Sequence, residues 1–500
     1  MTSRIRTLLH SSIILSGAVS LLVQSVYIRE ILATFRGGEF TLGTVLFFWL
    51  IWTAIGSGII GRHTSRMGDP AVRFFTILPW YGIFGYCGIM MTGTLPAVIN
   101  LTYGEVVPYD RQFLAVSVLM MPFNIVGGIL FVTGVQALES ARERFSGSVF
   151  SLEALGSGAA GLVFSFALVP YLQNRVITAM ILLVVLFVSG AASLTPALKR
   201  CRIPYAVSIL TAVIAIYFFE SLYIGMIDNR HILNVNDTPY GRLTVSRYNE
   251  QTTFYSDASP LFSMPDRETV EYMAHLPMLA AQNPRRVLII SGGPGGLIDE
   301  VLKYPDVVEV VSVEINPAIN SLARQYLDEP WHDDPRVTVI EDDGRSYLNS
   351  TSSVYDVIIC KAPPPLSGVA NRFYTRDFFR MVRTHLRTGG VFGFSLTGAE
   401  NYLPEELISY LGSIKLTMEE TFPSVSMFPG ITVHCLASPS HGLLDGLDWQ
   451  ALNHRRVERG IKTEFVRDYF LEYIFSEDRL LTFSVDIASV SYTHLRAHET

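Results

Sequence analysis

Cysteine is scarce in this 500-residue sequence. The four cysteines, Cys87, Cys201, Cys360 and Cys435, show neither the spacing of a metal site nor that of a disulfide framework. We therefore expect no metal centre, and we interpret the cysteines as small apolar residues of the core. An excess of positive charge is also lacking, because the formal net charge is −7. That balance argues against a general nucleic-acid-binding protein.

Charged residues are rare in the first half of the chain. Residues 8–226 contain long apolar stretches, whereas residues 231–480 have the composition of an ordinary soluble domain. A helix needs about 20 apolar residues to cross a bilayer. We therefore expect seven transmembrane helices and a multi-pass protein of a bacterial inner membrane, with the lipid bilayer as a partner. The predicted spans are 8–28, 40–61, 71–95, 112–137, 150–172, 176–197 and 204–226.

The first predicted span lacks a signal-peptide cleavage pattern and is followed by Arg29-Glu30, so we expect it to be retained. The fifth span carries Gly-Ser-Gly-Ala-Ala-Gly at 156–161, and such small residues favour a close helix–helix contact. Three polar residues lie in or at the edge of spans, Asn124, Glu153 and Glu220. The two glutamates either mark a substrate path or pair within the bundle.

Positive charge is distributed unevenly among the loops between these spans. One set of loops holds ten basic residues, Arg4, Arg6, Arg62, Arg66, Arg73, Arg142, Arg144, Lys199, Arg200 and Arg202. The other set holds four, Arg29, Arg36, Arg111 and Arg175. The positive-inside rule then places the N-terminus in the cytoplasm. Seven spans carry the following soluble domain to the opposite face of the membrane.

The most informative motif lies in the second half. An apolar run at 287–290 leads into Ser-Gly-Gly-Pro-Gly-Gly at 291–296, and an amphipathic helical pattern follows from Leu297. A second apolar run, 307–313, is closed by Glu314. This layout is typical of a nucleotide-binding unit in which glycines let the backbone approach the ligand and an acid accepts hydrogen bonds from ribose hydroxyls.

Strand and helix patterns alternate through the soluble half. Residues 240–263 alternate and turn like a small β-meander, and residues 266–283 read as a helix. Strands are predicted at 286–291, 308–314, 336–341, 355–360 and 390–396, with helices at 296–304, 317–327 and 374–387. This order indicates a parallel, doubly wound sheet whose ligand lies at the carboxyl ends of the strands.

The expected fold is therefore a polytopic α-helical membrane domain joined to an α/β Rossmann-like domain of the methyltransferase type, which begins with the meander. We divide the chain into a membrane domain at 1–230, a Rossmann-like domain at 231–440, a C-terminal extension at 441–488 and a tail at 489–500. The tail resembles translated adapter sequence. We expect the natural chain to be truncated near residue 488 and the tail to be non-native.

Residues 238–437 resemble the spermidine synthase (polyamine aminopropyltransferase) family. The resemblance is carried by Ser-Gly-Gly-Pro-Gly-Gly at 291–296, Val-Glu-Ile-Asn-Pro at 313–317, Asp-Asp-Gly at 342–344, Tyr-Asp-Val-Ile-Ile at 355–359 and Tyr-Thr-Arg-Asp-Phe-Phe at 374–379. It extends to membrane-spanning proteins that carry this domain. It implies a transferase whose donor is decarboxylated S-adenosylmethionine or a related adenosyl ligand, and whose acceptor is a polyamine precursor such as putrescine.

The resemblance also assigns roles to residues of the donor site. Glu314 is expected to hold the ribose, and Asp343 the adenine amino group, although Asp343 can equally be a helix N-cap. Four glycines would approach the donor, Gly292, Gly293, Gly295 and Gly296.

The acceptor side departs from the family pattern. Where the family carries acids after the fourth strand, this chain has Lys361 and Pro364, and Pro294 replaces an acid of the glycine turn. An ammonium must lose a proton before it can attack, so the site needs a base. The base is not identified, and the remaining candidates are Asp257 and Glu271.

These departures leave two functions open. The first is group transfer from an S-adenosyl-type donor, with Lys361 and Arg372 suited to an anionic acceptor in place of a polyamine. The second is a non-catalytic membrane transporter or sensor that binds a metabolite through a degenerate synthase domain. The sequence leaves the oligomeric state undetermined.

Overall fold

A computed structural model describes residues 3–64, 68–99, 107–140, 146–327, 333–365, 367–400 and 402–488. Three of the basic loop residues used for orientation, Arg66, Arg142 and Arg144, lie outside these ranges, as does the predicted tail. The chain divides into two compact units. Unit 1 contains residues up to Arg247 together with Tyr255–Pro260. Unit 2 contains Tyr248–Phe254 and the residues from Leu261 onward.

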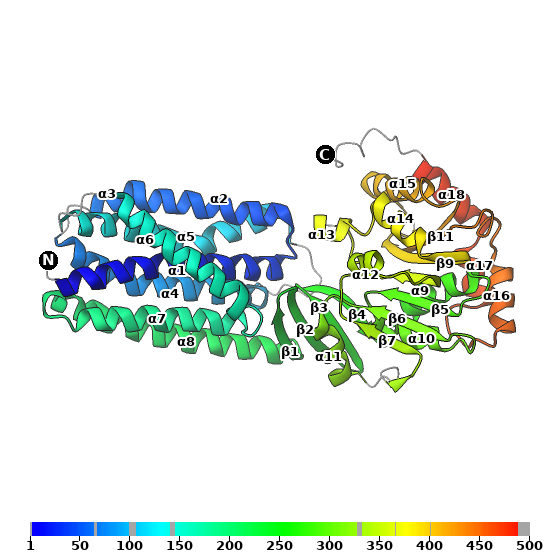
Figure 1. Cartoon of the computed structure of the whole chain (residues 1–500), viewed down its shortest axis with the longest axis horizontal. Helices are drawn as coiled ribbons and strands as arrows, with labels where there is room; N and C mark the ends of the chain where they lie inside the picture. The colour runs from blue at the N-terminus through cyan, green and yellow to red at the C-terminus, as the bar shows by residue number, and fades with distance from the viewer. Residues whose placement is uncertain are drawn as a thin grey trace. The chain divides into compact units, whose positions relative to one another are not determined.

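Unit 1 is mainly a bundle of long helices (Figure 1). Seven helical segments of the described residues are long and apolar enough to cross a membrane, as judged by length and composition. They are built on α1 (Ser3–Phe35), α2 (Glu39–Ile55), α4 (Pro70–Val98), α5 (Tyr109–Ser140), α6 (Ser146–Val163), α7 (Asn174–Ser193) and α8 (Arg202–Asn229), with a short α3 (Gly61–Thr64) after α2. Each predicted span coincides with one of them.

The bundle is apolar on its outside as well as in its core. Tyr27, Phe74 and Phe123 are fully buried, yet Phe187 and Ile203 are 77% and 78% exposed. In water such a surface would be costly, whereas in lipid it matches the surroundings. The outer surface therefore has the chemistry of a membrane-facing bundle.

Helices α1 and α6 cross at the small residues that the sequence singled out. A Cβ atom on Gly156 would lie 1.9 Å from the carbonyl oxygen of Ile14, and one on Gly17 would lie 2.1 Å from that of Glu153. The Ser157 hydroxyl donates to the Gly17 carbonyl at 2.8 Å. The predicted close helix–helix contact is confirmed, and only glycine fits at both positions.

Four strands form the predicted meander in the order β1-β2-β3-β4. They are β1 (Ile232–Thr238), β2 (Gly241–Tyr248), β3 (Gln251–Ser256) and β4 (Ser259–Met264). The division between the two units runs through these strands, whereas the expected domain boundary lies at 230/231.

Unit 2 is built on a seven-stranded sheet with the order β10-β11-β9-β8-β5-β6-β7. Strands β5 (Arg286–Ile290), β6 (Glu309–Val313), β7 (Val337–Ile340), β8 (Tyr355–Cys360) and β9 (Leu386–Thr397) run parallel. A hairpin of β10 (Ser424–Phe428) and β11 (Thr432–Ser438) adds antiparallel to β9. Both faces are covered, so β8 is buried throughout and β5 is buried from Val287 onward. The predicted Rossmann-like fold is confirmed.

Helices surround this sheet in Figure 1. They are α9 (Arg267–Ala280), α10 (Ile298–Leu302), α11 (Pro317–Tyr326), α12 (Gly344–Ser350), α13 (Gly368–Asn371), α14 (Arg376–Thr384), α15 (Glu405–Glu419), α16 (Trp449–Glu458), α17 (Asp468–Ile474) and α18 (Glu477–Ala488). Residues from α16 and α17 belong to the core: Leu452 and Leu471 pack in the same buried cluster as Val287 and Ile289 of β5. The segment expected to be a separate extension is thus part of unit 2.

Candidate functional site

The glycine turn directly follows β5, at the carboxyl edge of the parallel sheet. Ser291, Gly292 and Gly296 have positive φ angles of 62°, 74° and 89°. A Cβ atom on Gly293 would lie 2.3 Å from the Ser312 hydroxyl, and one on Gly295 would lie 2.7 Å from the Phe262 ring. The four glycine positions are therefore restricted to residues without side chains, and within 291–296 Ser291 and Pro294 carry the only side chains.

Glu314 stands beside this turn because β5 and β6 are parallel neighbours in which Ile290 pairs with Val313. Its side chain is almost fully buried, at 3% exposure. The carboxylate accepts from the Ser291 hydroxyl at 3.2 Å and from the Gly292 and Asn316 amides at 3.4 Å each. Burial raises the pKa of Glu314, and these donors oppose the rise. These long hydrogen bonds leave the carboxylate able to accept from a ligand hydroxyl.

Asp343 follows β7, the next strand along the same edge. Its Oδ1 accepts from the Arg345 and Ser346 amides at 3.1 Å each, which caps the N-terminus of α12. Its Oδ2 forms an ion pair with the Arg372 guanidinium. The alternative helix-cap role is therefore realised. Arg372, which was considered a binding group for an anion, is neutralised by Asp343 and also stacks on Phe373 with its guanidinium carbon 4.9 Å from the ring centroid.

Lys361 follows β8 and lies on the glycine turn. Its amide donates to the Ile290 carbonyl at 2.9 Å. Its side chain covers Gly292, because a Cβ atom there would lie 2.5 Å from the Lys361 Cδ. The Lys361 Nζ is 5.9 Å from the Phe262 ring centroid. Burial lowers the pKa of Lys361 to about 8, and the nearby Asp266 carboxylate opposes that shift.

Three comparisons place these elements among known proteins. Residues 268–435 match the spermine/spermidine synthase domain. A polyamine aminopropyltransferase of Oceanobacillus iheyensis is 30% identical over 252 residues, which cover 46% of this chain and 48% of that one. Polyamine aminopropyltransferase 1 of Hyperthermus butylicus is 34% identical over 206 residues, which cover 39% of this chain and 70% of that one.

The chain belongs to the spermine/spermidine synthase family. The family resemblance lies in its C-terminal part, and the chain spans about half the length of the Oceanobacillus relative. Among solved structures, a spermidine synthase in complex with the transition-state analogue AdoDATO is 20% identical, with a TM-score of 0.45 over 52% of this chain and 88% of that one.

Glu271 has a structural role in the synthase domain. The Glu271 carboxylate accepts from three successive backbone amides, those of Glu464, Phe465 and Val466, at 2.8 to 3.1 Å. Since it is buried and already binds these donors, it fastens the segment before α17 to α9. This geometry gives no support to Glu271 as the missing base.

The other two acceptor-side positions, Asp257 and Pro364, lie in different parts of the structure. Asp257 belongs to unit 1, in the turn between β3 and β4, and its Oδ1 accepts from the Arg242 amide at 2.8 Å. Pro364 is exposed in the loop after β8. That loop is held by Tyr374, whose hydroxyl lies 3.2 Å from the Ala362 carbonyl oxygen and 3.1 Å from that of Pro363. Tyr374 is buried, and the sequence could not predict these bonds.

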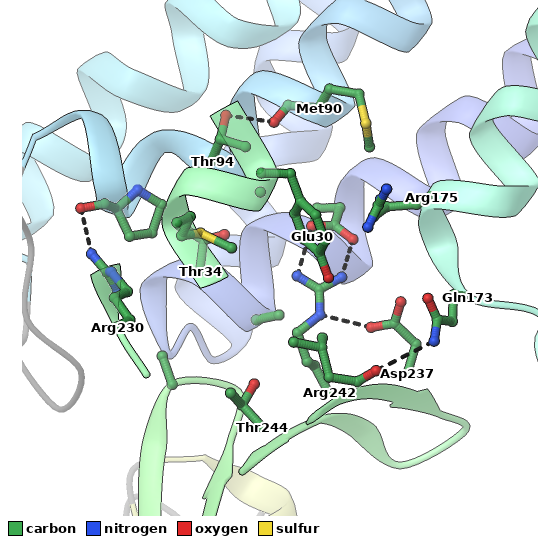
Figure 2. A pocket seen from close by; sticks show the side chains of 17 residues that line it. Glu30, Thr34, Met90, Thr94, Gln173, Arg175, Arg230, Asp237, Arg242 and Thr244 are labelled. Atoms are coloured by element: carbon green, nitrogen blue, oxygen red, sulfur yellow. Dashed lines mark hydrogen bonds and ion pairs between the residues drawn. The ribbon is translucent and has the colours of Figure 1, made fainter. Parts of the chain in front are cut away.

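Unit 1 of this synthase-family chain contains a second candidate site, a polar cavity lined by residues of α1, α4, α7, α8 and the β1–β2 pair. Figure 2 shows Arg242 between the carboxylates of Glu30 and Asp237. Arg242 Nη1 lies 3.0 Å from Glu30 Oε2, and its Nε lies 2.7 Å from Asp237 Oδ1. The Asn174 side-chain amide also donates to Glu30, at 2.8 Å. Glu30 is thus buried, and both of its carboxylate oxygens accept hydrogen bonds from neighbouring side chains.

Two further arginines line the same cavity. Arg175 pairs with Glu220 at 2.6 Å and lies 3.6 Å from the Tyr223 ring centroid. Arg230 donates to the Pro96 carbonyl at 2.7 Å. Glu220, which the sequence left as either a path residue or a paired group, is paired here. Glu153 accepts from the Ser16 hydroxyl at 3.1 Å. Among the described residues no group of three His, Cys, Asp or Glu is arranged to hold a metal ion.

Proposed function

We propose that unit 2 binds an S-adenosyl-type donor at the glycine turn and transfers a group from it to an amine. Glu314 is the observation that carries the proposal. It is a buried carboxylate beside bare backbone at the carboxyl edge of a parallel sheet, which is where ribose hydroxyls are bound in folds of this kind. Asp343 and the glycines 292, 293, 295 and 296 complete the proposed donor site.

Tail transfer from such a donor is a displacement at carbon. The amine nitrogen forms a bond to the carbon next to the sulfonium, the carbon–sulfur bond breaks, and its electron pair leaves with the thioether. For an aminopropyl tail the leaving group is methylthioadenosine. The attacking ammonium must first lose a proton to a base. The loop 361–367 after β8 offers no carboxylate for this step, so we propose that aminopropyl transfer to a polyamine is slow.

The test is release of methylthioadenosine by the purified full-length protein. The protein is incubated with S-adenosylmethionine or its decarboxylated form, together with a panel of amines. Release that depends on both donor and amine supports tail transfer. Adenosyl-ligand binding without release from any combination would leave the donor site in place and contradict the transfer.

A second candidate function rests on unit 1. The apolar outer surface of its helices supports anchoring in a lipid bilayer, and the cavity around Glu30 and Arg242 is lined by both charged and apolar residues. We propose as the alternative that the chain is a non-catalytic membrane transporter or sensor, in which the synthase domain binds a metabolite. Ligand-dependent uptake or signalling by the wild-type protein, without release of methylthioadenosine, would favour the alternative.

A further inference from the structure

Lys361 brings a positive charge to the glycine turn itself. Its aliphatic stem covers Gly292, and its amine extends toward Phe262, the ring that also lies against Gly295. A ligand placed on this turn must therefore come close to the Lys361 amine. The same Gly292 carries the Glu314 contact on its amide. Gly292 therefore contacts both groups: its amide donates to Glu314, the proposed ribose-binding residue, and the Lys361 side chain covers it.

Few residues contribute charge around Lys361. The turn 291–297 reads Ser-Gly-Gly-Pro-Gly-Gly-Leu, and the loop 361–367 reads Lys-Ala-Pro-Pro-Pro-Leu-Ser, so Lys361 is the only charged residue in either stretch. Asp266 is the one acid whose electrostatic effect on Lys361 is resolved. Lys361 forms no ion pair among the described residues. The Glu314 carboxylate, which accepts from the Gly292 amide, is the other charge beside the turn, and Lys361 supplies the one positive charge of these two stretches.

We propose that Lys361 selects a donor whose tail retains a carboxylate, of the S-adenosylmethionine type, over the decarboxylated donor. The inference rests on the proposed function, because it concerns the same donor site. A decarboxylated tail carries two positive charges, on the sulfonium and the ammonium, and a lysine repels both. A tail with a carboxylate keeps these two positive charges and adds one negative group that the lysine ammonium can bind, and charge-assisted hydrogen bonds of this kind are strong.

The experiment measures affinity by calorimetry on the full-length protein in detergent. Three ligands are compared: S-adenosylmethionine, decarboxylated S-adenosylmethionine and methylthioadenosine. Methylthioadenosine has no charged tail, so it reports whether the adenosyl site is formed. The variants are Lys361→Asp and the near-isosteric Lys361→Met. Lys415→Asp, which makes the same charge change on α15, is the matched control.

The wild-type protein should bind S-adenosylmethionine about tenfold or more tightly than the decarboxylated donor. Lys361→Met should bring the two affinities close to each other, and Lys361→Asp should make the decarboxylated donor the tighter ligand. Lys415→Asp should keep the wild-type ratio of affinities.

Three results would overturn the inference. Equal or tighter binding of the decarboxylated donor by the wild-type protein would do so, as would a ratio unchanged in Lys361→Met. In both cases the proposed donor site would stand, because adenosyl ligands bind. Failure of all three ligands to bind the wild-type protein would instead reject the proposed function, and the inference with it.

Discussion

The positively charged side chain of Lys361 is partly buried in the folded protein. Burial lowers its pKa to about 8, well below its ordinary value of 10.5, so the unfolded chain binds a proton more tightly than the folded one does. This difference lowers the free energy of unfolding. The destabilisation is greatest below about pH 8, and it disappears as the pH rises to about 10.5. Partial exposure reduces its size.

The substitution Lys361→Met should therefore raise the melting temperature at pH 7, and the gain should shrink steadily toward pH 10. Methionine keeps the volume and flexibility of the side chain without the charge. Thermal unfolding of both proteins across this pH range is the measurement, with Lys415→Met as the control. A gain that grows with pH would contradict the sign of the shift.

The loss of acids at positions 361 and 364 predicts weak aminopropyl transfer. Loss of a general base alone reduces a rate by about 10²–10⁴-fold. We expect the purified full-length protein to convert putrescine to spermidine at a rate lower by about this factor than a family member with both acids. Product quantification under identical donor concentrations checks this. Robust spermidine production would require a base other than Asp257 and Glu271, because both carboxylates already accept hydrogen bonds from backbone amides.

Some residue positions followed from the sequence and others did not. Glu314 and Asp343 were singled out because each lies at or just after the end of a predicted strand, and parallel strands end at one edge of the sheet. The Arg372–Asp343 pair and the binding of Glu271 to the 464–466 amides could not be found in this way. Both depend on how distant segments dock, which hydrophobic periodicity does not encode.

Whole elements were predicted most reliably where the pattern was long or strictly ordered. The seven apolar helices and the alternating strands of unit 2 follow from span length and from periodicity. The packing of α16 and α17 could not be predicted from the sequence, because short amphipathic patterns do not indicate which core a helix joins. In the structure Leu452 and Leu471 fill the core beside β5.

Docking of the segment before α17 onto α9 provides a test at the level of elements. Removing the carboxylate with Glu271→Ala leaves three backbone amides without their acceptor, and two of them, of Phe465 and Val466, lie deepest in the contact. We expect a loss of about 2–5 kcal/mol in the free energy of unfolding. Proteolysis should begin in residues 460–488.

The control for that variant is Glu268→Ala, which changes an exposed acid on the same helix. It should leave stability within about 0.5 kcal/mol of the wild-type value. Equal effects of the two substitutions in denaturant titrations would show that Glu271 does not fasten the segment.

The whole molecule raises a question of orientation. The ten-to-four bias in basic loop residues predicts a cytoplasmic N-terminus, and seven spans then carry the chain to the other face. A reporter fused after residue 240 should accordingly read as extracytoplasmic. A cytoplasmic signal would mean that one helix does not cross, with α4 and α5 the first to re-examine. It would also place the synthase domain where adenosyl donors are made.

The central claim is that Glu314 holds the ribose of an adenosyl ligand. It is tested most directly by calorimetric titration of the full-length protein with methylthioadenosine, whose uncharged tail makes the result independent of Lys361. Glu314→Ala should weaken binding by about 1–3 kcal/mol, because ribose hydroxyls lose a charged acceptor. Glu309→Ala, at the other end of β6, should leave binding unchanged. Equal affinity of the wild-type protein and Glu314→Ala would contradict the account.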